Sequence, residues 1–248
     1  MLNFNFQSIG ELLNRIETEQ GEGSQSAKNM FLKGSYDAKW YGGINTLELY
    51  KETVKNGYLP AVEQMQGQAA TTDGNNQNFT SSESGQFGDV AKYLSGEPEC
   101  MFDFETQEAN NYMILNIDAV TPYTTSGNVL MNKCKAIFNA VNILEATGTR
   151  VKINLSIAIE DRKKGSKKTG EKMQMNLLIK DYQDNFVSSL HGLLIGNLAT
   201  VRGAMYAYLS IHAQSSSLGK PIESIFTDGK KVSFINHSEE EIKRIILN

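Results

Sequence analysis

Residues 112–160 constrain the fold more than any other part of this chain. Residues 112–117 form an apolar run typical of a buried strand. From residue 129 to 144 apolar side chains recur with the 3.6-residue period of an amphipathic helix, which Gly148 ends. Along residues 150–160 every second side chain is apolar, as in a strand. The succession predicts a right-handed βαβ unit with two parallel strands.

The remaining C-terminal sequence extends this unit. Residues 173–179 alternate like a strand, and we expect them to pair with residues 150–160 as a hairpin with a long tip. Residues 186–211 form a largely apolar helical region rich in Gly and Ala, which we expect to pack across one face of the sheet. A strand at 231–235 and a capped helix at 242–247 follow. The sequence therefore predicts an α/β fold, a three-layer sandwich with a mixed, mainly parallel sheet.

The N-terminal part has different patterns. Helical patterns cover residues 9–16, where Ser8 and Glu11 are spaced as a capping box, residues 46–57, and a stretch around 61–65. Polar residues and glycines crowd out apolar ones between Gly67 and Gly88. We therefore predict a helical N-terminal region at 1–66, a flexible polar segment at 67–88 and the α/β domain at 89–248.

Composition restricts the cellular setting and the class of partner. The 248 residues include two cysteines, Cys100 and Cys134, which lie in different predicted elements, so we expect no disulfide framework. Neither a signal-peptide pattern nor a run of about 18 apolar residues occurs, which favours a cytoplasmic protein that does not engage a membrane. The net charge of −4 argues against a surface built throughout to bind nucleic acid.

Residues 113–118, the Thr/Ser/Gly loop and helix that follow, and residues 148–153 together resemble the first βαβ unit of von Willebrand factor A-like domains. The resemblance implies a Rossmann-like sheet and places Asp118 where that family's first metal-site aspartate ends its strand. That family reads Asp-x-Ser-x-Ser at this point. Here the two serine positions hold Val120 and Pro122, so the motif is degenerate.

A second resemblance comes from residues 89–101, taken with the upstream Trp40-Tyr41-Gly42-Gly43. This combination is similar to a family of uncharacterised proteins common in bacteriophage genomes, and the similarity spans most of the chain. It implies a phage-type accessory protein and supplies no mechanism.

Asp118 and the hydroxyls after it form the candidate metal site. Open parallel sheets place ligands at the carboxyl ends of their strands, and hard oxygen ligands suit Mg²⁺. The set is Asp118, Thr121, Thr124 and Ser126. The alternative is that these residues cap the next helix and satisfy the backbone of the loop.

Other catalytic signatures are weak. His191, His212 and His237 lack the spacing of a zinc site, and nothing in the spacing joins Cys100 to one of them. The segment from Gly165 to Gly170 resembles a phosphate-binding loop in composition only, because it lies in a hairpin. We therefore assign no catalytic residues.

Two further segments are candidate interaction surfaces. The hairpin tip at 162–172 is basic and can contact a phosphate backbone or an acidic partner, or simply be a solvated loop; its cations are Arg162, Lys163, Lys164, Lys167, Lys168 and Lys172. Trp40 and Tyr41 offer an aromatic surface, or anchor a core. Either the Trp40 region or the Gly/Ala-rich helix is where we would look first for a contact between copies of the chain.

These observations favour a non-enzymatic binding or assembly protein, a phage accessory factor whose main partner is another protein. The first alternative is a nucleic-acid-binding protein of phage replication that uses the basic hairpin. The second is a metal-dependent enzyme with Mg²⁺ at Asp118.

Overall fold

The computed structural model describes residues 1–19, 29, 46–56, 79–82, 87–88, 101–104, 111–121, 125, 127–161, 170–184, 198–212 and 220–248. The main helices in these ranges are α1 (Ile9–Thr18), α3 (Leu47–Asn56), α6 (Gly127–Ala146), α8 (Leu198–His212) and α9 (Glu239–Leu247). None of them is both long and apolar enough to cross a membrane.

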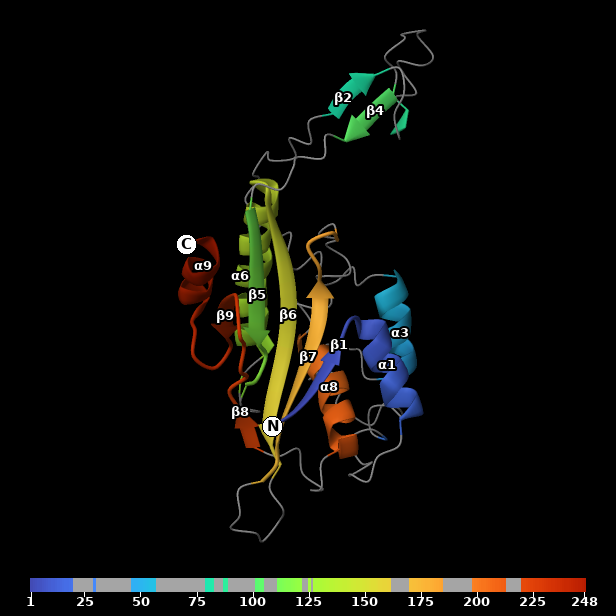
Figure 1. The fold of residues 1–248 in the computed structure, drawn as a ribbon, viewed down its shortest axis with the longest axis vertical. Coiled ribbons are helices and arrows are strands. Elements are labelled where there is room, and N and C mark those ends of the chain that lie inside the picture. The colour runs from blue at the N-terminus through green and yellow to red at the C-terminus, as the bar shows by residue number, and fades with distance from the viewer. Residues whose placement is uncertain are drawn as a thin grey trace.

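A mixed sheet of six strands organises the fold (Figure 1). Its strands are β1 (Leu2–Phe6), β5 (Asn111–Asp118), β6 (Thr149–Glu160), β7 (Lys172–Lys180), β8 (Lys220–Ile222) and β9 (Lys230–Ser233). Five follow the order β1-β7-β6-β5-β9, and β8 pairs with the end of β6. The pairs β1/β7, β5/β6 and β5/β9 are parallel, whereas β6 runs antiparallel to β7 and β8.

The prediction of an α/β fold with a mixed, mainly parallel sheet is therefore confirmed. The expected βαβ unit is β5, α6 and β6, with Leu115 opposite Ile153 in a parallel register. The expected hairpin is β6 and β7, with Glu160 opposite Lys172. The capped C-terminal helix is α9, where Ser238 and Glu241 form the full capping box.

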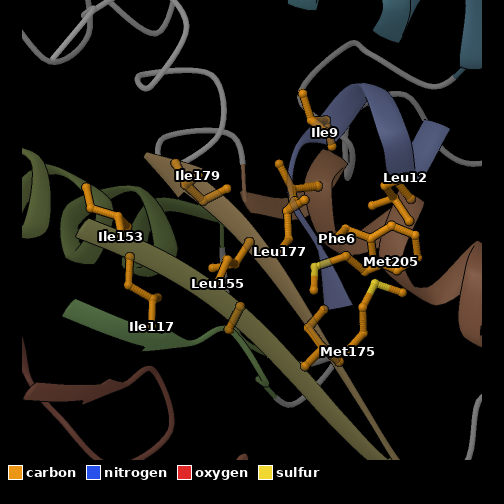
Figure 2. Close-up of a cluster of buried hydrophobic side chains, with 14 of the residues drawn as sticks. Phe6, Ile9, Leu12, Ile117, Ile153, Leu155, Met175, Leu177, Ile179 and Met205 are labelled. Atoms are coloured by element: carbon orange, nitrogen blue, oxygen red, sulfur yellow. The ribbon is translucent and has the colours of Figure 1, made fainter. Parts of the chain in front are cut away.

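The hydrophobic core lies between one face of the sheet and the helices. Residues at alternate positions of β5, β6 and β7 point to this face, among them Ile117, Leu155 and Met175, all fully buried. Figure 2 shows them beside Leu12 of α1 and Met205 of α8. Burial of these apolar side chains is the main force that holds the helices against the sheet.

The described helices form one connected layer, so the expected three-layer sandwich is not confirmed by the described residues. α1 contacts α8, α8 contacts α6, and α6 contacts α9, so they form one connected layer; Figure 1 shows α6 and α8 behind the sheet. The physical reason is the alternation of polarity along β6 and β7. Their other face carries polar side chains, which do not pack favourably on an apolar helix: Lys152, Asn154 and Asn176 are half-buried, whereas Ser156 and Gln174 are buried.

The N-terminus also differs from the expected helical extension. Residues 2–6 form β1, which pairs in parallel with β7, and α1 packs on α8. Leu2, Phe4 and Phe6 alternate with Asn3 and Asn5, which is the period-two pattern of a strand. The described part of this region therefore belongs to the main sheet and its helical layer.

A second, three-stranded sheet lies apart from the first in Figure 1. Its order is β2 (Phe79–Ser82), β4 (Met101–Phe104) and β3 (Phe87–Gly88). β2 and β3 fall within the segment 67–88 that we predicted to be flexible, so part of that segment has regular structure. The stretches around 61–65 and 186–197, predicted as helical, lie outside the described residues.

Candidate functional site

The sheet face opposite the helices carries a polar row, which we call the polar face. Five residues on five adjacent strands stand in register across it: Asn5, Asn176, Ser156, Asp118 and Ser233. Asn176 is the centre of a hydrogen-bond network, since its amide donates to Asn5 Oδ1 (2.8 Å) and its Oδ1 accepts from Ser156 Oγ (2.8 Å) and Gln174 Nε2 (2.9 Å). These bonds fix the side chains of a row that runs from the exposed Asn5 through the half-buried Asn176 to the buried Ser156.

Residues 223–229, which we call the strap, cross part of this face between β8 and β9. Ser224 donates from its backbone N–H to Asp118 Oδ2 (3.2 Å) and from its hydroxyl to Oδ1 (3.1 Å). Gln174 makes a two-way contact with Ile225, accepting from its N–H (2.8 Å) and donating to its carbonyl (2.9 Å). Polar side chains of the sheet thus satisfy backbone groups of the strap, as buried backbone requires.

The far end of the strap is held just as closely. The Asn116 amide donates to the Asp228 carbonyl (2.6 Å), and Asn154 donates to Asn116 Oδ1 (3.0 Å). Gly229 turns the chain into β9 with φ of +78°, and a Cβ there would lie 2.6 Å from the Ile114 carbonyl oxygen. Only glycine combines that conformation with such a close approach.

Asp118 is buried at 1% exposure, and both its carboxylate oxygens accept hydrogen bonds, including one from the Val120 N–H (3.4 Å). Burial raises the pKa of Asp118, and the bonds from Ser224 and Val120 and the charge of Lys231 oppose that rise only in part. In this structure its role is to anchor the strap to the end of β5.

The predicted Mg²⁺ site stays a prediction, because only Asp118 and Thr121 of its four residues are described. In this structure the Asp118 carboxylate is hydrogen-bonded to Ser224, and the described residues contain no group of three His, Cys, Asp or Glu side chains suited to a metal. Thr121, three residues after Asp118 in the chain, is buried. Thr124 and Ser126 lie outside the described residues. Val120, at the first serine position of the expected motif, contributes its backbone N–H.

Two tyrosines mark the end of the polar face where β5 begins, and we call this group the aromatic end. Tyr112 of β5 and Tyr182, just after β7, meet edge to face with ring centroids 5.2 Å apart. Lys152 of β6 lies between these strands, with its Nζ 5.8 Å from the Tyr182 ring centroid and 3.5 Å from Asp181 Oδ1. The Tyr112 side chain is left largely open, at 66% exposure.

The basic hairpin lies at the opposite end of β6. In the register of the sheet, Glu160 of β6 lies opposite Lys172 of β7 on one side and opposite Lys220 of β8 on the other. Both lysines are exposed. Arg162, Lys163, Lys164, Lys167 and Lys168 lie outside the described residues, as do Trp40 and Tyr41. The structure therefore confirms the antiparallel pairing of β6 and β7, while the tip of the hairpin lies outside the described residues.

The described histidines and cysteine are engaged elsewhere in the fold. His212 faces Glu19 (3.3 Å) beside Tyr208, whose hydroxyl donates to the same carboxylate (3.1 Å). Burial and Glu19 raise the pKa of Tyr208 to about 12. His237 Nδ1 accepts from the Ser233 N–H, and Cys134 is buried in α6. Cys100 and His191 fall outside the described residues.

Sequence reasoning found Asp118 but missed the residues that surround it in space. Ser224, Gln174 and Asn116 come from three separate segments, and no local pattern joins them. One signal was available: Lys152, Asn154 and Ser156 alternate with apolar residues on β6, which marks a polar sheet face. Tyr112, the first residue of the predicted strand, lies on that face by its register.

Comparison with known proteins gives one match. A family model described as Domain of unknown function (DUF7192) covers residues 1–246. No curated protein and no solved structure matches the chain significantly.

Proposed function

This chain belongs to the DUF7192 family, and we propose that it is a non-enzymatic binding or assembly protein that engages another macromolecule, foremost a protein, through the polar face of its sheet. The observation that carries the proposal is the division of the sheet into a helix-covered apolar face and an opposite polar face, among the described residues.

The polar face has the rigidity that a binding surface needs. Side-chain hydrogen bonds join Asn5, Asn176 and Ser156, and the strap is tied down at both ends. A surface fixed before binding loses little conformational entropy when a partner docks. Asp118, the main candidate for chemistry, instead supports this surface from below the strap.

The finer parts of the proposal rest on the sequence resemblances. The parallel βαβ unit, whose first strand ends at Asp118, is consistent with a degenerate von Willebrand factor A-like domain. Such domains resemble adhesion and assembly modules, which agrees with a binding role. The role of a phage accessory factor acting in the host cytoplasm rests on residues 89–101 and Trp40 to Gly43 alone.

The test compares two arginine substitutions at exposed asparagines on opposite sides of the molecule. Asn5→Arg places a bulky cation on the polar face, and Asn142→Arg does the same on the outer side of α6. Affinity capture from the cells that express the protein should recover a partner with the wild type and with Asn142→Arg, and lose it with Asn5→Arg. A partner retained by Asn5→Arg and lost with Asn142→Arg would refute the proposal.

A second candidate is nucleic-acid binding through the hairpin, favoured by the exposure of Lys172 and Lys220 at its base. Clustered lysines release counterions from a phosphate backbone, so affinity should fall steeply as salt rises.

This candidate is tested by replacing Lys163, Lys164, Lys167, Lys168 and Lys172 with Gln. If it is correct, labelled oligonucleotides bind the wild type in low salt and not the variant, and nuclease treatment removes captured material. Equal binding of oligonucleotides by both proteins would exclude the hairpin as the contact.

A further inference from the structure

The aromatic end of the polar face has the geometry of a cation-binding surface. The Tyr112 and Tyr182 rings meet edge to face, so their faces point in different directions, and Tyr112 is the more exposed of the two. Tyrosine faces carry negative electrostatic potential and attract ammonium and guanidinium groups within about 6 Å.

Three aspartates lie at this end of the sheet together with two cations of β6, Lys152 and Arg150. Arg150 is the register partner of Tyr112, and its guanidinium pairs with Glu145. Asp181 and Asp184 follow β7, with Asp184 Oδ2 accepting from the Asp181 N–H (2.8 Å), and the exposed Asp228 lies at the tip of the strap. Burial, then the charges of Asp181 and Asp228, raise the pKa of Tyr182, so both carboxylates act on this ring. Lys152 is the cation that faces them from β6.

Lys152 also shows how the surface holds a positive group. Its ammonium lies over the Tyr182 ring while it contacts the Asp181 carboxylate, so it uses one aromatic face and one acid together. The exposed Tyr112 ring meets Tyr182, and the charge of Asp228 acts on the Tyr182 ring, so an aromatic face and a carboxylate are both present at this end of the sheet.

We infer that the aromatic end docks a basic segment, one that carries arginine or lysine, of a protein partner. This inference rests on the proposed function and adds to it the contact residues and the chemistry of the partner. The three carboxylates repel a phosphate backbone, so nucleic acid does not suit this end of the sheet. Lys172 and Lys220, at the base of the basic hairpin, lie beside Glu160 at the other end of β6, roughly 33 Å from the residue opposite Tyr112 and well beyond the range of screened charge interactions.

The experiment measures fluorescence anisotropy of three labelled probes: an Arg-Gly repeat peptide, a Glu-Gly repeat peptide and oligo-dT. The Arg-Gly peptide should bind with an affinity that falls as salt rises. Tyr112→Ala should weaken it about tenfold, and Asp181→Asn with Asp228→Asn should weaken it further. Ile225→Ala is the matched control because Ile225 has the same 66% exposure but lies on the strap away from the rings; it should bind like the wild type.

Three results would overturn the inference: equal Arg-Gly affinity in the wild type and Tyr112→Ala, tighter binding of the Glu-Gly peptide, or oligo-dT binding that depends on Tyr112. Unfolding midpoints of all variants show whether a loss of binding reflects a loss of fold. If the captured partner still depends on Asn5 while the Arg-Gly peptide fails to bind, the inference fails and the proposed function stands.

Discussion

At the scale of single residues, the strap depends on two positions that tolerate no simple replacement. The Asp118 carboxylate accepts hydrogen bonds from the N–H and the hydroxyl of Ser224 at the start of the strap. Gly229 allows the chain to turn close to the Ile114 carbonyl at the other end. Both residues hold the strap in place, so substitutions of either should change the stability of the protein, which can be measured without knowledge of the partner.

Replacing Gly229 by alanine should lower the free energy of unfolding by about 2 kcal/mol or more, because alanine is strained at φ of +78° and its Cβ would clash with the Ile114 carbonyl. Gly10→Ala is the control, since the nearest atom to a Cβ there is 3.8 Å away and the site is helical. That variant should be neutral or slightly more stable. Urea unfolding measures both; equal effects would show that the turn at Gly229 is not constrained as described.

Asp118 should make stability depend on pH. Because burial raises its pKa in the folded state above the unfolded value of about 3.9, the folded protein holds this proton more tightly than the unfolded chain. The resulting stabilisation is fully present below pH 3.9 and is lost as pH rises through the folded-state pKa.

Asp118→Asn should be less stable overall, because an amide nitrogen replaces an acceptor of the Ser224 bonds, and should lack this pH dependence. The measurement is the difference in unfolding free energy between wild type and variant from pH 3 upward. The advantage of the wild type should shrink as pH rises from there. An advantage that grows with pH would mean that the folded state lowers the pKa of Asp118.

At the scale of elements, a register shift between β6 and β7 brings one side chain of β7, that of Lys180, into contact with the end of α6. The shift between Ile153 and Asn154 turns Lys180 to the helix side, where it is fully buried. Its Nζ contacts Glu145 Oε1 (2.9 Å) and donates to the carbonyls of Val151 (3.0 Å) and Asp181 (3.1 Å). The lysine therefore fixes three segments at one point.

Lys180→Met should destabilise the protein by about 2–3 kcal/mol, because it removes the buried member of the two cations that pair with the largely buried Glu145 and leaves Arg150 as the other. Lys152→Met removes a half-exposed ion pair with Asp181 and should change stability by less than about 1 kcal/mol. Chemical denaturation of the two variants gives the comparison. A Lys180 effect as small as that of Lys152 would show that the buried cluster contributes little.

Element by element, local periodicity predicted β5, α6, β6 and β7 because their apolar positions repeat along the chain. The same periodicity was present at Leu2, Phe4 and Phe6, but five residues before a clear helix cap were too short to be recognised as a strand. The register shift at Lys180 and the contacts of the strap could not be predicted, since they depend on which strands become neighbours. Asp118 was identified from its place at a strand end, yet its partner Ser224 lies 106 positions away.

At the scale of the whole molecule, one layer of helices covers one side of the sheet, and the polar face and strap form the other side of the described structure. β1 completes this arrangement from the N-terminus, since Phe6 packs edge to face on Tyr208 of α8 at 4.9 Å. Phe6→Ala should therefore cost about 3–5 kcal/mol, as a core position does. A change near zero by thermal or chemical unfolding would mean that the first strand is peripheral.

The measurement that tests the central claim most directly is hydroxyl-radical footprinting of the protein, free and bound to its captured partner. Exposed reporters exist on both sides: Tyr112 and Ile225 on the polar side, Val129 and Ile143 on α6. Binding through the polar face predicts that oxidation of Tyr112 falls in the complex while Val129 and Ile143 stay unchanged. Protection of Val129 and Ile143 with Tyr112 still fully reactive would place the partner on the helical layer and contradict the account.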